Sequence, residues 1–290
     1  MVTRPPAGLA DRVFDAAVVF ILALIGLAAL LPLLLVISVS LTPYGEVLRR
    51  GGVVLIPREI TFEAYRQLWN YPRIFTAFKV TVFITLVGTL LNLLVSTPAA
   101  YALSKEELPG RRLLFPIIVF TMYFYAGIIP RYWIVKTTGL LNSLWAMIVP
   151  GLISTFNMLI VMGYFRSLPV ELFEAARLDG AGEFWILWAV AVPLAKPALA
   201  VVGLLFAVQQ WNTFQRAIFF IPNRDLWPLQ PVVREILLLT KLVIPDPTVS
   251  VPTVTMQMAT VVFVSVPILS AYPFVQRYFT RGLLVGAIKG

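Results

Sequence analysis

The chain has 290 residues, of which 59% are hydrophobic and only 13% are charged, with a mean hydropathy of +0.88 and a formal net charge of +9. About 25% of the residues of a soluble domain are charged, so this composition excludes a soluble globular protein and indicates an integral membrane protein. The chain contains neither Cys nor His, which excludes disulfides, thiolate or imidazole catalysis and the usual zinc sites.

Long apolar runs follow one another along the chain, and each is long enough to cross about 30 Å of hydrocarbon as a helix. Their apolar residues do not alternate with polar ones, which favours helices over the strands of a membrane barrel. The first run is longer than the apolar core of a cleaved signal peptide, so we expect it to remain as the first span. We predict an all-α integral membrane protein with one transmembrane domain over residues 1–290. The predicted spans are approximately 16–40, 80–104, 113–135, 140–163, 197–220 and 255–276.

A charged segment lies between the fourth and fifth predicted spans, in a loop over residues 164–196. Pro169 and Gly180 bracket a short helix within it, since proline is tolerated in the first helical turn and glycine is favoured just past the last. The helix carries too many charges for lipid, yet it has one apolar face at helical spacing. We predict an amphipathic helix that lies against another surface. Its apolar face comprises Leu168, Leu172, Phe173 and Ala176.

Polar side chains inside the predicted spans are costly in lipid and usually face the interior of a helix bundle. No acidic residue falls inside a span, which disfavours an ion-binding site or catalysis within the membrane. Amides and aromatic rings are candidates for lining a translocation pathway, where rings can stack on sugars, but hydrogen bonding between helices explains them equally well. The pathway candidates are Gln209, Asn212, Tyr123, Trp211 and Asn157, with Asn92, Gln210, Gln215, Gln257 and Tyr125 also considered.

Charge alone does not orient the chain. An even number of spans places both termini on one side, and Lys and Arg divide almost evenly between the two sides. The side opposite the termini is the more basic one, which suits an anionic solute or an acidic partner, although pairing with lipid phosphates explains it as well.

The charged segment resembles the EAA loop of ABC-importer permeases. The likeness lies in Glu174-Ala175-Ala176, in Gly180 and in the stretch that ends at Pro193, where Val190 and Val192 replace the Ile and Leu of the family pattern. Other parts of the chain look like the carbohydrate-importing, maltose-permease-like branch, and most like its alginate-oligosaccharide importers. These parts are the segments Gly127–Ile160, Gln209–Phe220 and Arg277–Gly290.

The resemblance implies a type I ABC importer permease fold, with six transmembrane helices and a cytoplasmic coupling helix in the loop 164–196. It implies a bacterial cytoplasmic (inner) membrane location with both termini in the cytoplasm. The coupling helix would dock its apolar face into a groove on an ATP-binding subunit, whereas an interfacial amphipathic helix is the simpler alternative. The tail Gly286–Gly290 would reach between the ATP-binding subunits, unless it is a frayed terminus. The implied coupling residues are Glu174, Ala175, Ala176, Leu178, Asp179 and Gly180.

We therefore expect the permease subunit of an ATP-driven importer that passes an oligosaccharide, of an acidic alginate type, into the cytoplasm. The implied partners are a homologous second permease, two ATP-binding subunits, an extracytoplasmic solute-binding protein, the oligosaccharide and membrane lipid, with no nucleic acid. The sequence lacks a GxxxxGK[ST] phosphate loop, so we expect no catalytic residue, metal or cofactor on this chain and ATP with Mg on the partner subunits. The alternatives are an ion-coupled secondary transporter of a small solute and a membrane enzyme, and both are disfavoured by the lack of intramembrane acids.

Overall fold

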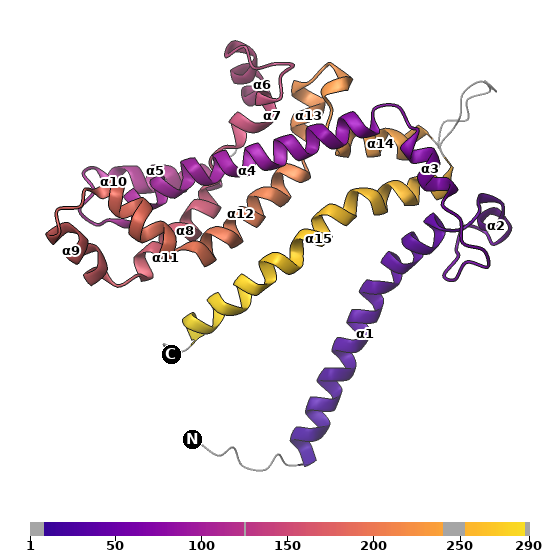
Figure 1. Ribbon diagram of the computed structural model, residues 1–290, viewed down its shortest axis with the longest axis horizontal. Helices are drawn as coiled ribbons and strands as arrows, with labels where there is room; N and C mark the ends of the chain where they lie inside the picture. Colours follow the sequence, from indigo (N-terminus) through magenta and orange to yellow (C-terminus); the bar gives the residue numbers. More distant parts are fainter. Residues whose placement is uncertain (1–8, 125, 240–252, 288–290) are drawn as a thin grey trace. The chain divides into compact units, whose positions relative to one another are not determined.

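A computed structural model describes residues 9–124, 126–239 and 253–287, and every regular element in these ranges is a helix (Figure 1). The predicted all-α class is therefore confirmed. The chain forms two compact units. Unit 1 comprises Met1–Tyr71 and Ile236–Val264, and unit 2 comprises Pro72–Glu235 and Ser265–Gly290.

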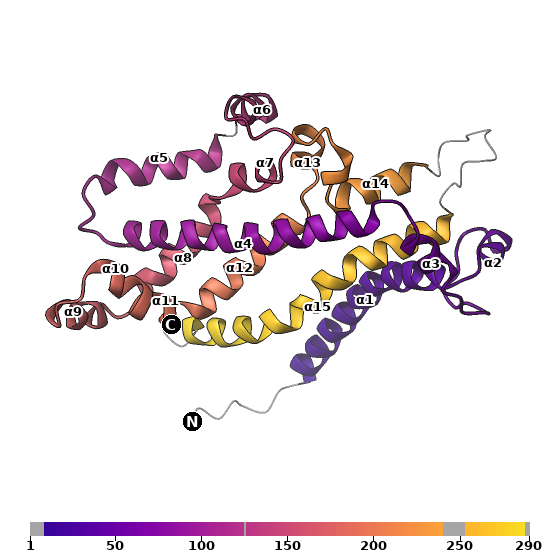
Figure 2. The same cartoon turned by 45° about the horizontal axis from the view of Figure 1, so that its top comes forward.

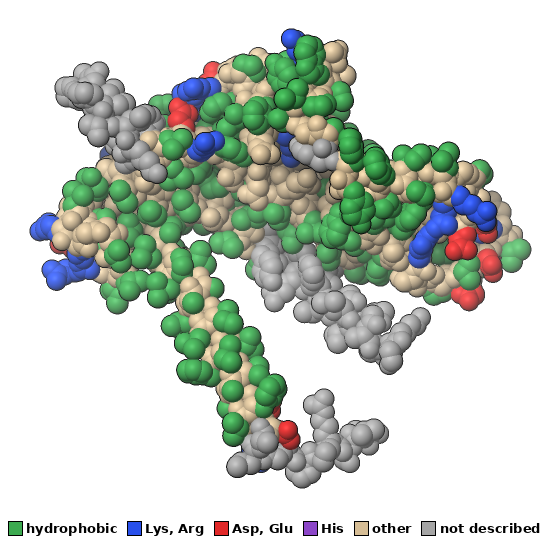
Figure 3. All heavy atoms as spheres, turned by 180° about the vertical axis from the view of Figure 1, so that it is seen from behind, with side chains coloured by type: hydrophobic (Ala, Val, Ile, Leu, Met, Phe, Trp, Pro, Cys, Tyr) green, Lys and Arg blue, Asp and Glu red, His purple; other side chains and the backbone are tan. Residues whose placement is uncertain are grey.

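Unit 1 is built around α1, Leu9–Ser40, whose apolar side chains point outward along nearly its whole length (Figure 3). An apolar helix that buries almost none of its surface in protein is typical of a helix that faces lipid. Two short helices follow, α2 (Tyr44–Arg49) and α3 (Glu63–Trp69), and the last helix, α15 (Val254–Ala287), begins in this unit. The small core of unit 1 consists of Val39, Val47 and Val54, packed against Leu35, Val254 and Met258.

Unit 2 is organised by α4, Ile74–Ser104, which packs along α8 (Thr155–Ser167) and α12 (Lys196–Trp211) (Figure 2). The buried face of α4 carries small or polar residues, which let the backbones of neighbouring helices approach closely. Pro98 lies inside this helix. The buried residues of that face include Thr81, Gly88, Asn92, Ser96, Thr97 and Ala100.

Three apolar runs predicted as single spans are interrupted in the structure. The run 113–135 divides into α5 (Arg111–Tyr123) and α6 (Ile128–Thr137). The run 140–163 divides into α7 (Trp145–Ile148), the 3₁₀ turn η1 (Val149–Gly151) and α8, with a bend of 49°. The run 197–220 divides at residues 212–214 into α12 and α13 (Gln215–Phe220).

These runs are therefore not the uninterrupted helices that the sequence predicted. Local backbone chemistry explains two of the breaks, because Gly127 takes a left-handed φ of 83° before α6 and Ser154 caps α8 by accepting a hydrogen bond from the Asn157 N–H. The helices α1 and α4 are each long and apolar enough to cross a membrane. Three bent helix pairs also meet this requirement if each pair is counted as one span.

The loop after α8 holds α9 (Val170–Leu178), α10 (Glu183–Ile186), the π-helical turn η2 (Leu187–Ala191) and α11 (Val192–Leu194). The chain then bends by 84° into α12. Pro193 is the second residue of α11, and Pro197 lies in the first turn of α12, where its missing N–H costs nothing.

The remaining elements complete unit 2 and the C-terminal part of the chain. They are η3 (Arg224–Leu226) and α14 (Leu229–Leu239), whose first N–H donates to the Thr81 hydroxyl at 2.8 Å. The predicted span 255–276 falls within α15. Tyr125 and residues 288–290 of the predicted tail contact lie outside the described residues.

Candidate functional site

The helix α9 ends in the tight stop that the sequence predicted at Gly180. Its φ is 82°, a left-handed conformation that glycine adopts without the steric cost that a Cβ would impose. The Gly180 N–H donates to the Arg177 carbonyl and the Ala181 N–H to the Ala176 carbonyl, both at 3.0 Å. This pair of bonds is a Schellman motif, which satisfies the last carbonyls of the helix and turns the chain away.

One face of α9 packs against the body of unit 2. Phe173 is 5% exposed and lies in a core cluster with Tyr101 of α4 and Phe165 of α8, while Leu168 and Ala176 are partly buried against the same cluster. The Tyr101 ring is perpendicular to Phe165, with centroids 5.6 Å apart, and tilted against Phe173 at 6.3 Å. The predicted apolar face therefore anchors the helix to its own chain.

This packing corrects the sequence prediction in two respects. The face of Phe173 is not available for a groove on another subunit, because the core of this chain already covers it. Leu172, which was assigned to that face, is instead 43% exposed. The spacing of apolar residues predicts the amphipathic helix, but it does not show whether this chain or another subunit covers the apolar face.

The opposite face of α9 is open and carries five of the six predicted coupling residues, whereas Ala176 is partly buried against the core cluster. Glu174, Ala175 and Asp179 are exposed, and Leu178 is 88% exposed. A hollow of about 750 Å³ lies beside this face. Its lining includes Leu172, Ala175, Ala176, Asp179, Gly180 and Trp185. The structure thus brings the six predicted coupling residues together on and beside one short helix.

A set of side chains around Glu183, here called the Glu183 cluster, fixes α9 to the end of α4. It consists of Tyr101, Lys105, Phe173, Arg177 and Glu183. The Tyr101 hydroxyl donates to Glu183 Oε2 at 2.7 Å, and Arg177 Nε donates to Glu183 Oε1 at 2.8 Å. Lys105 Nζ lies 3.8 Å from the same carboxylate. One carboxylate therefore joins α4, α9 and α10.

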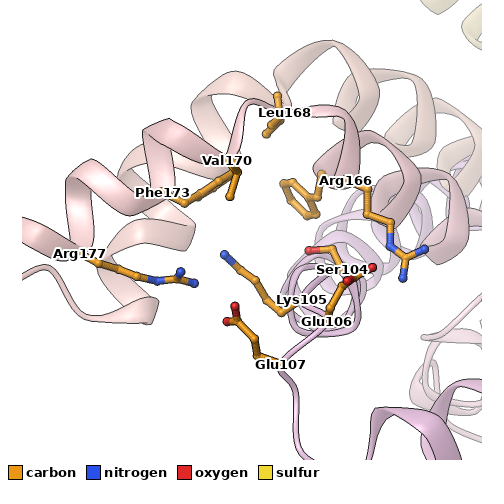
Figure 4. A pocket seen from close by; sticks show the side chains of 10 residues that line it. Ser104, Lys105, Glu106, Glu107, Arg166, Leu168, Val170, Phe173 and Arg177 are labelled. Carbon is orange, nitrogen blue, oxygen red and sulfur yellow. The ribbon is translucent and has the colours of Figure 1, made fainter.

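Lys105 is also held by aromatic rings. Its Nζ lies 4.3 Å from the centroid of Phe173 and 4.5 Å from that of Tyr101, within the range of cation–π attraction. Figure 4 shows the Lys105 side chain extending between Phe173 and Arg177, with Glu107 close by. A cavity of about 390 Å³, lined also by Ser104, Arg166 and Val170, opens beside these groups.

The electrostatics of the Glu183 cluster favour its ion pairs. Burial by itself would raise the pKa of Glu183, but hydrogen bonds from Tyr101 and Arg177 and the charges of Lys105 and Arg177 outweigh burial, so the pKa is lowered. The hydrogen bond to Glu183 raises the pKa of Arg177. Burial lowers the pKa of Lys105, against the attraction of Glu183. The carboxylate is therefore ionised at neutral pH.

Sequence reasoning did not identify the Glu183 cluster. Tyr101 and Glu183 are 82 residues apart, and nothing in the sequence pairs them. A weak signal was present, since Tyr101 and Lys105 lie at i and i+4 where the second predicted span ends, and such pairs share a helix face.

The predicted pathway residues do not form one site. Gln209 and Asn212 are exposed at the end of α12, where Asn212 Oδ1 accepts from Gln230 Nε2 at 3.1 Å. Trp211 is 7% exposed and packs edge-on against Phe78, and Asn157 is 5% exposed in α8. Tyr123, at the end of α5, is 84% exposed. Among these five residues, only Gln209 and Asn212 are exposed close together in the chain, and Gln215, which was also considered, is exposed beside them.

Comparisons with known proteins agree with this architecture. Protein LplC of Bacillus subtilis (strain 168) is 36% identical over 285 residues, which cover 97% of this chain and 96% of the relative. The polygalacturonan/rhamnogalacturonan transport system permease protein YtcP of the same organism is 35% identical, covering 97% and 99%.

A crystal structure of a bacterial ABC transporter involved in the import of the acidic polysaccharide alginate contains a chain with the same fold. The TM-score is 0.86 at 33% identity, and the match covers 95% of this chain and 100% of that chain. The expected permease fold is thus confirmed.

The family model of the binding-protein-dependent transport system inner membrane component matches residues 74–285. This match confirms the resemblance seen around Glu174 and Gly180, and it supports an importer subunit rather than an ion-coupled secondary transporter. The chain therefore belongs to the family of binding-protein-dependent transport system inner membrane components.

Proposed function

We propose that this chain is the permease subunit of an ATP-driven importer and that α9 is its contact with an ATP-binding subunit. The two faces of α9 carry this proposal. Phe173 and Arg177 bind the helix to its own chain, while Leu178 and Glu174 point into solvent with no covering partner in the described part of the chain. A helix that is rigidly held on one side and open on the other is suited to receive a motion and transmit it.

The Glu183 cluster gives the route for that motion within unit 2. Because Glu183 binds Tyr101 of α4 and Arg177 of α9, a displacement of α9 moves the end of α4 with it. Charge-assisted hydrogen bonds are stronger and geometrically stricter than neutral ones. The bonds to Glu183 therefore fix the orientation of α9 relative to α4 as well as the distance between them. Closure of the two ATP-binding subunits around ATP would then shift the population between two packings of the membrane helices.

The partners of this subunit follow from the proposed role. They are a homologous second permease, two ATP-binding subunits that hold ATP and Mg, and an extracytoplasmic solute-binding protein. The loop 164–196 and both termini lie in the cytoplasm, since α9 has to reach an ATPase there. The chain itself contributes no ATP site, because its sequence lacks a phosphate loop.

The cargo is an oligosaccharide with acidic sugars. Two relatives that align with nearly the whole chain are named for uronic-acid polymers, polygalacturonan and alginate. The more basic side of the chain, which lies opposite the termini, supports the same class by attracting anions. Gln209 and Asn212 are the residues of this subunit that we assign to the pathway.

Charge reversal on the open face of α9 tests the coupling role. In the purified complex, Glu174→Lys should abolish ATP hydrolysis stimulated by the binding protein and weaken association of the ATP-binding subunits. Glu59→Lys is the control for association of the ATP-binding subunits, because Glu59 is also exposed but lies in the loop after the first span, on the predicted outer side. Unchanged stimulation in Glu174→Lys would show that α9 does not couple.

Cargo class is tested separately in proteoliposomes that contain the complex and its binding protein. Trigalacturonate and an alginate trisaccharide should stimulate ATP hydrolysis, whereas arabinotriose should not. Equal stimulation by the neutral sugar would remove the acidic-cargo proposal and leave the coupling role of α9 standing.

A further inference from the structure

A buried hydrogen-bonded chain of side chains joins α4, α12, α13 and the α7–η1 segment of unit 2. Asn92 of α4 donates to the Gly151 carbonyl at 2.8 Å and accepts from Gln210 Nε2 of α12 at 3.1 Å. Gln210 Oε1 in turn accepts from Arg216 Nη2 at 3.1 Å. Asn92 and Gln210 are at most 1% exposed. We call these groups, with Thr213 and the Met147 carbonyl, the Arg216 network.

Arg216 is the charged member of the network, and it lies within a predicted span. Its Nη2 also donates to the Thr213 hydroxyl at 2.9 Å, and its Nη1 donates to the Met147 carbonyl. Among the residues that the structure describes, no carboxylate lies within ion-pair distance of this guanidinium. A cation at membrane depth is expensive and usually functional, and here only neutral oxygens satisfy it.

Three of the oxygens that Arg216 and Asn92 engage lie at helix breaks. Met147 is in the single turn α7, Gly151 ends η1 before the bend into α8, and Thr213 lies in the gap between α12 and α13. Helix ends expose carbonyls without an intrahelical donor, and in a membrane these must be satisfied by protein or by water. The network therefore satisfies the groups that the interrupted helices leave open.

Two glycines show that the space around the network is filled. A Cβ on Gly151 would lie 2.6 Å from Arg216 Nη1, and a Cβ on Gly88 would lie 2.8 Å from Gln210 Nε2. Both distances are too short for real contacts, so these glycines admit the guanidinium and the amide. By contrast, a Cβ on Gly163 of α8 would meet nothing within 4 Å.

We propose that Arg216 is a positioning residue that latches α13 onto the α7–η1 segment and thereby holds the transporter in its resting arrangement. The chemistry suits a latch that opens. Apolar packing of the same volume would stabilise the resting arrangement equally well. A polar contact differs, because its groups can exchange their protein partners for water when the translocation pathway opens and fills with water. When the latch is open, water satisfies Arg216 and the freed carbonyls, so both helix packings are accessible.

The first test uses the purified complex without binding protein or cargo, and it rests on the proposed ATP-driven role. Arg216→Gln should raise the uncoupled ATP hydrolysis rate by about tenfold, the change expected when a charge-assisted hydrogen bond that favours one of two states is lost. Gly151→Ala should act in the same way, because its Cβ displaces the guanidinium. Gly163→Ala is the matched control and should leave the rate unchanged.

The double variant Gly151→Ala/Arg216→Gln separates a latch from general damage. Glutamine is too short to meet the new Cβ, so the double variant should match Arg216→Gln alone rather than add to it. Uncoupled rates that stay at the wild-type value or fall below it in both single variants would overturn the latch, as would additive effects in the double variant.

A second readout does not depend on ATP hydrolysis. The chain has no Cys, so Ala217→Cys places its only thiol at a fully buried position of α13. A membrane-impermeant thiol reagent should label this residue about tenfold faster when Arg216→Gln is present, provided that α13 moves away from α7. Equal labelling rates would reject the latch even if the coupling proposal fails, because labelling requires only the folded subunit.

Discussion

The Glu183 cluster and the Arg216 network show two ways to hold helices together in one membrane subunit. The Glu183 cluster is charged and half open to solvent, with Glu183 paired to Arg177 and Lys105. The Arg216 network is buried, and within the described part of the chain its cation is bonded to amide, hydroxyl and carbonyl oxygens alone. The difference follows from the solvent at each place, because water and salt screen an exposed ion pair, whereas hydrocarbon makes every unsatisfied polar atom costly.

This contrast implies a division of roles. The ion pairs of Glu183 should contribute little to stability and much to the direction in which α9 moves, since exposed ion pairs are weak but geometrically specific. The buried network should contribute to stability and to the balance between two packings. Variants in the two regions can test that division.

The largest effect is expected from the apolar anchor of α9. Phe173→Ala removes a ring that is 5% exposed and should lower the free energy of unfolding by about 3 kcal/mol, with loss of stimulated ATP hydrolysis. Leu178→Ala, at a position 88% exposed, should leave stability unchanged but reduce stimulation. Thermal unfolding of the complex and its ATPase rate measure both. Equal destabilisation by the two variants would contradict the assignment of the two faces.

A smaller effect is expected from Asn92→Leu in the Arg216 network. The change leaves the Gly151 carbonyl and the Gln210 amide without their buried partner, which should cost about 2 kcal/mol of stability. The control is Leu90→Ala on the same helix, where the side chain is 65% exposed. Melting temperatures of the two variants in the same detergent compare them, and a stable Asn92→Leu protein would show that the network adds nothing to folding.

Glu183→Gln should have a still smaller effect on stability, less than about 1 kcal/mol, because the carboxylate is largely exposed and its ion pairs are screened. Stimulated ATP hydrolysis should nevertheless fall. Tyr101→Phe removes only the hydroxyl that donates to Glu183, so the double variant should lose no more than Glu183→Gln alone. If the losses of the two single variants add in the double variant, Tyr101 acts independently of the Glu183 carboxylate.

The smallest effect is expected from pH. The pKa of Glu183 is lowered below its ordinary value of 4.5, so its ion pairs stabilise the fold above that value and are lost only as the pH falls through the lowered pKa. The stability difference between wild type and Glu183→Gln should therefore stay constant between about pH 6 and pH 8. A difference that titrates within this range would mean that Glu183 lacks the partners described here.

Local features were predictable from the sequence, whereas distant pairings were not. The turn at Gly180 and the helix before it were predicted because adjacent residues determine them. Leu172 and Phe173 were assigned to one apolar face, yet Phe173 is buried and Leu172 is 43% exposed, since periodicity does not fix the edge of a buried stripe. For Asn92 and Gln210 the sequence left pathway lining and helix contact open, and the hydrogen bond between them, across 118 residues, shows the second.

The breaks in the apolar runs and the role of Arg216 escaped prediction for a related reason. Hydropathy reports whether a run can enter lipid, and it gives no information on where the backbone bends. Arg216 lies 69 residues from Met147, and only the folded chain reveals that a helix break there supplies its acceptor. Pathway roles for Gln209 and Asn212 stay predictions.

Pro98 lies between Asn92 and Tyr101 on α4, and so between the Arg216 network and the Glu183 cluster. Proline supplies no N–H to the carbonyl one turn earlier, so α4 is least stiff against bending between these two attachment points. Bending at Pro98 lets the part of α4 that carries Tyr101 change direction relative to the part that carries Asn92. Part of any displacement imposed on the Ser104 end of α4 would then be taken up as curvature of the helix before it reaches Asn92.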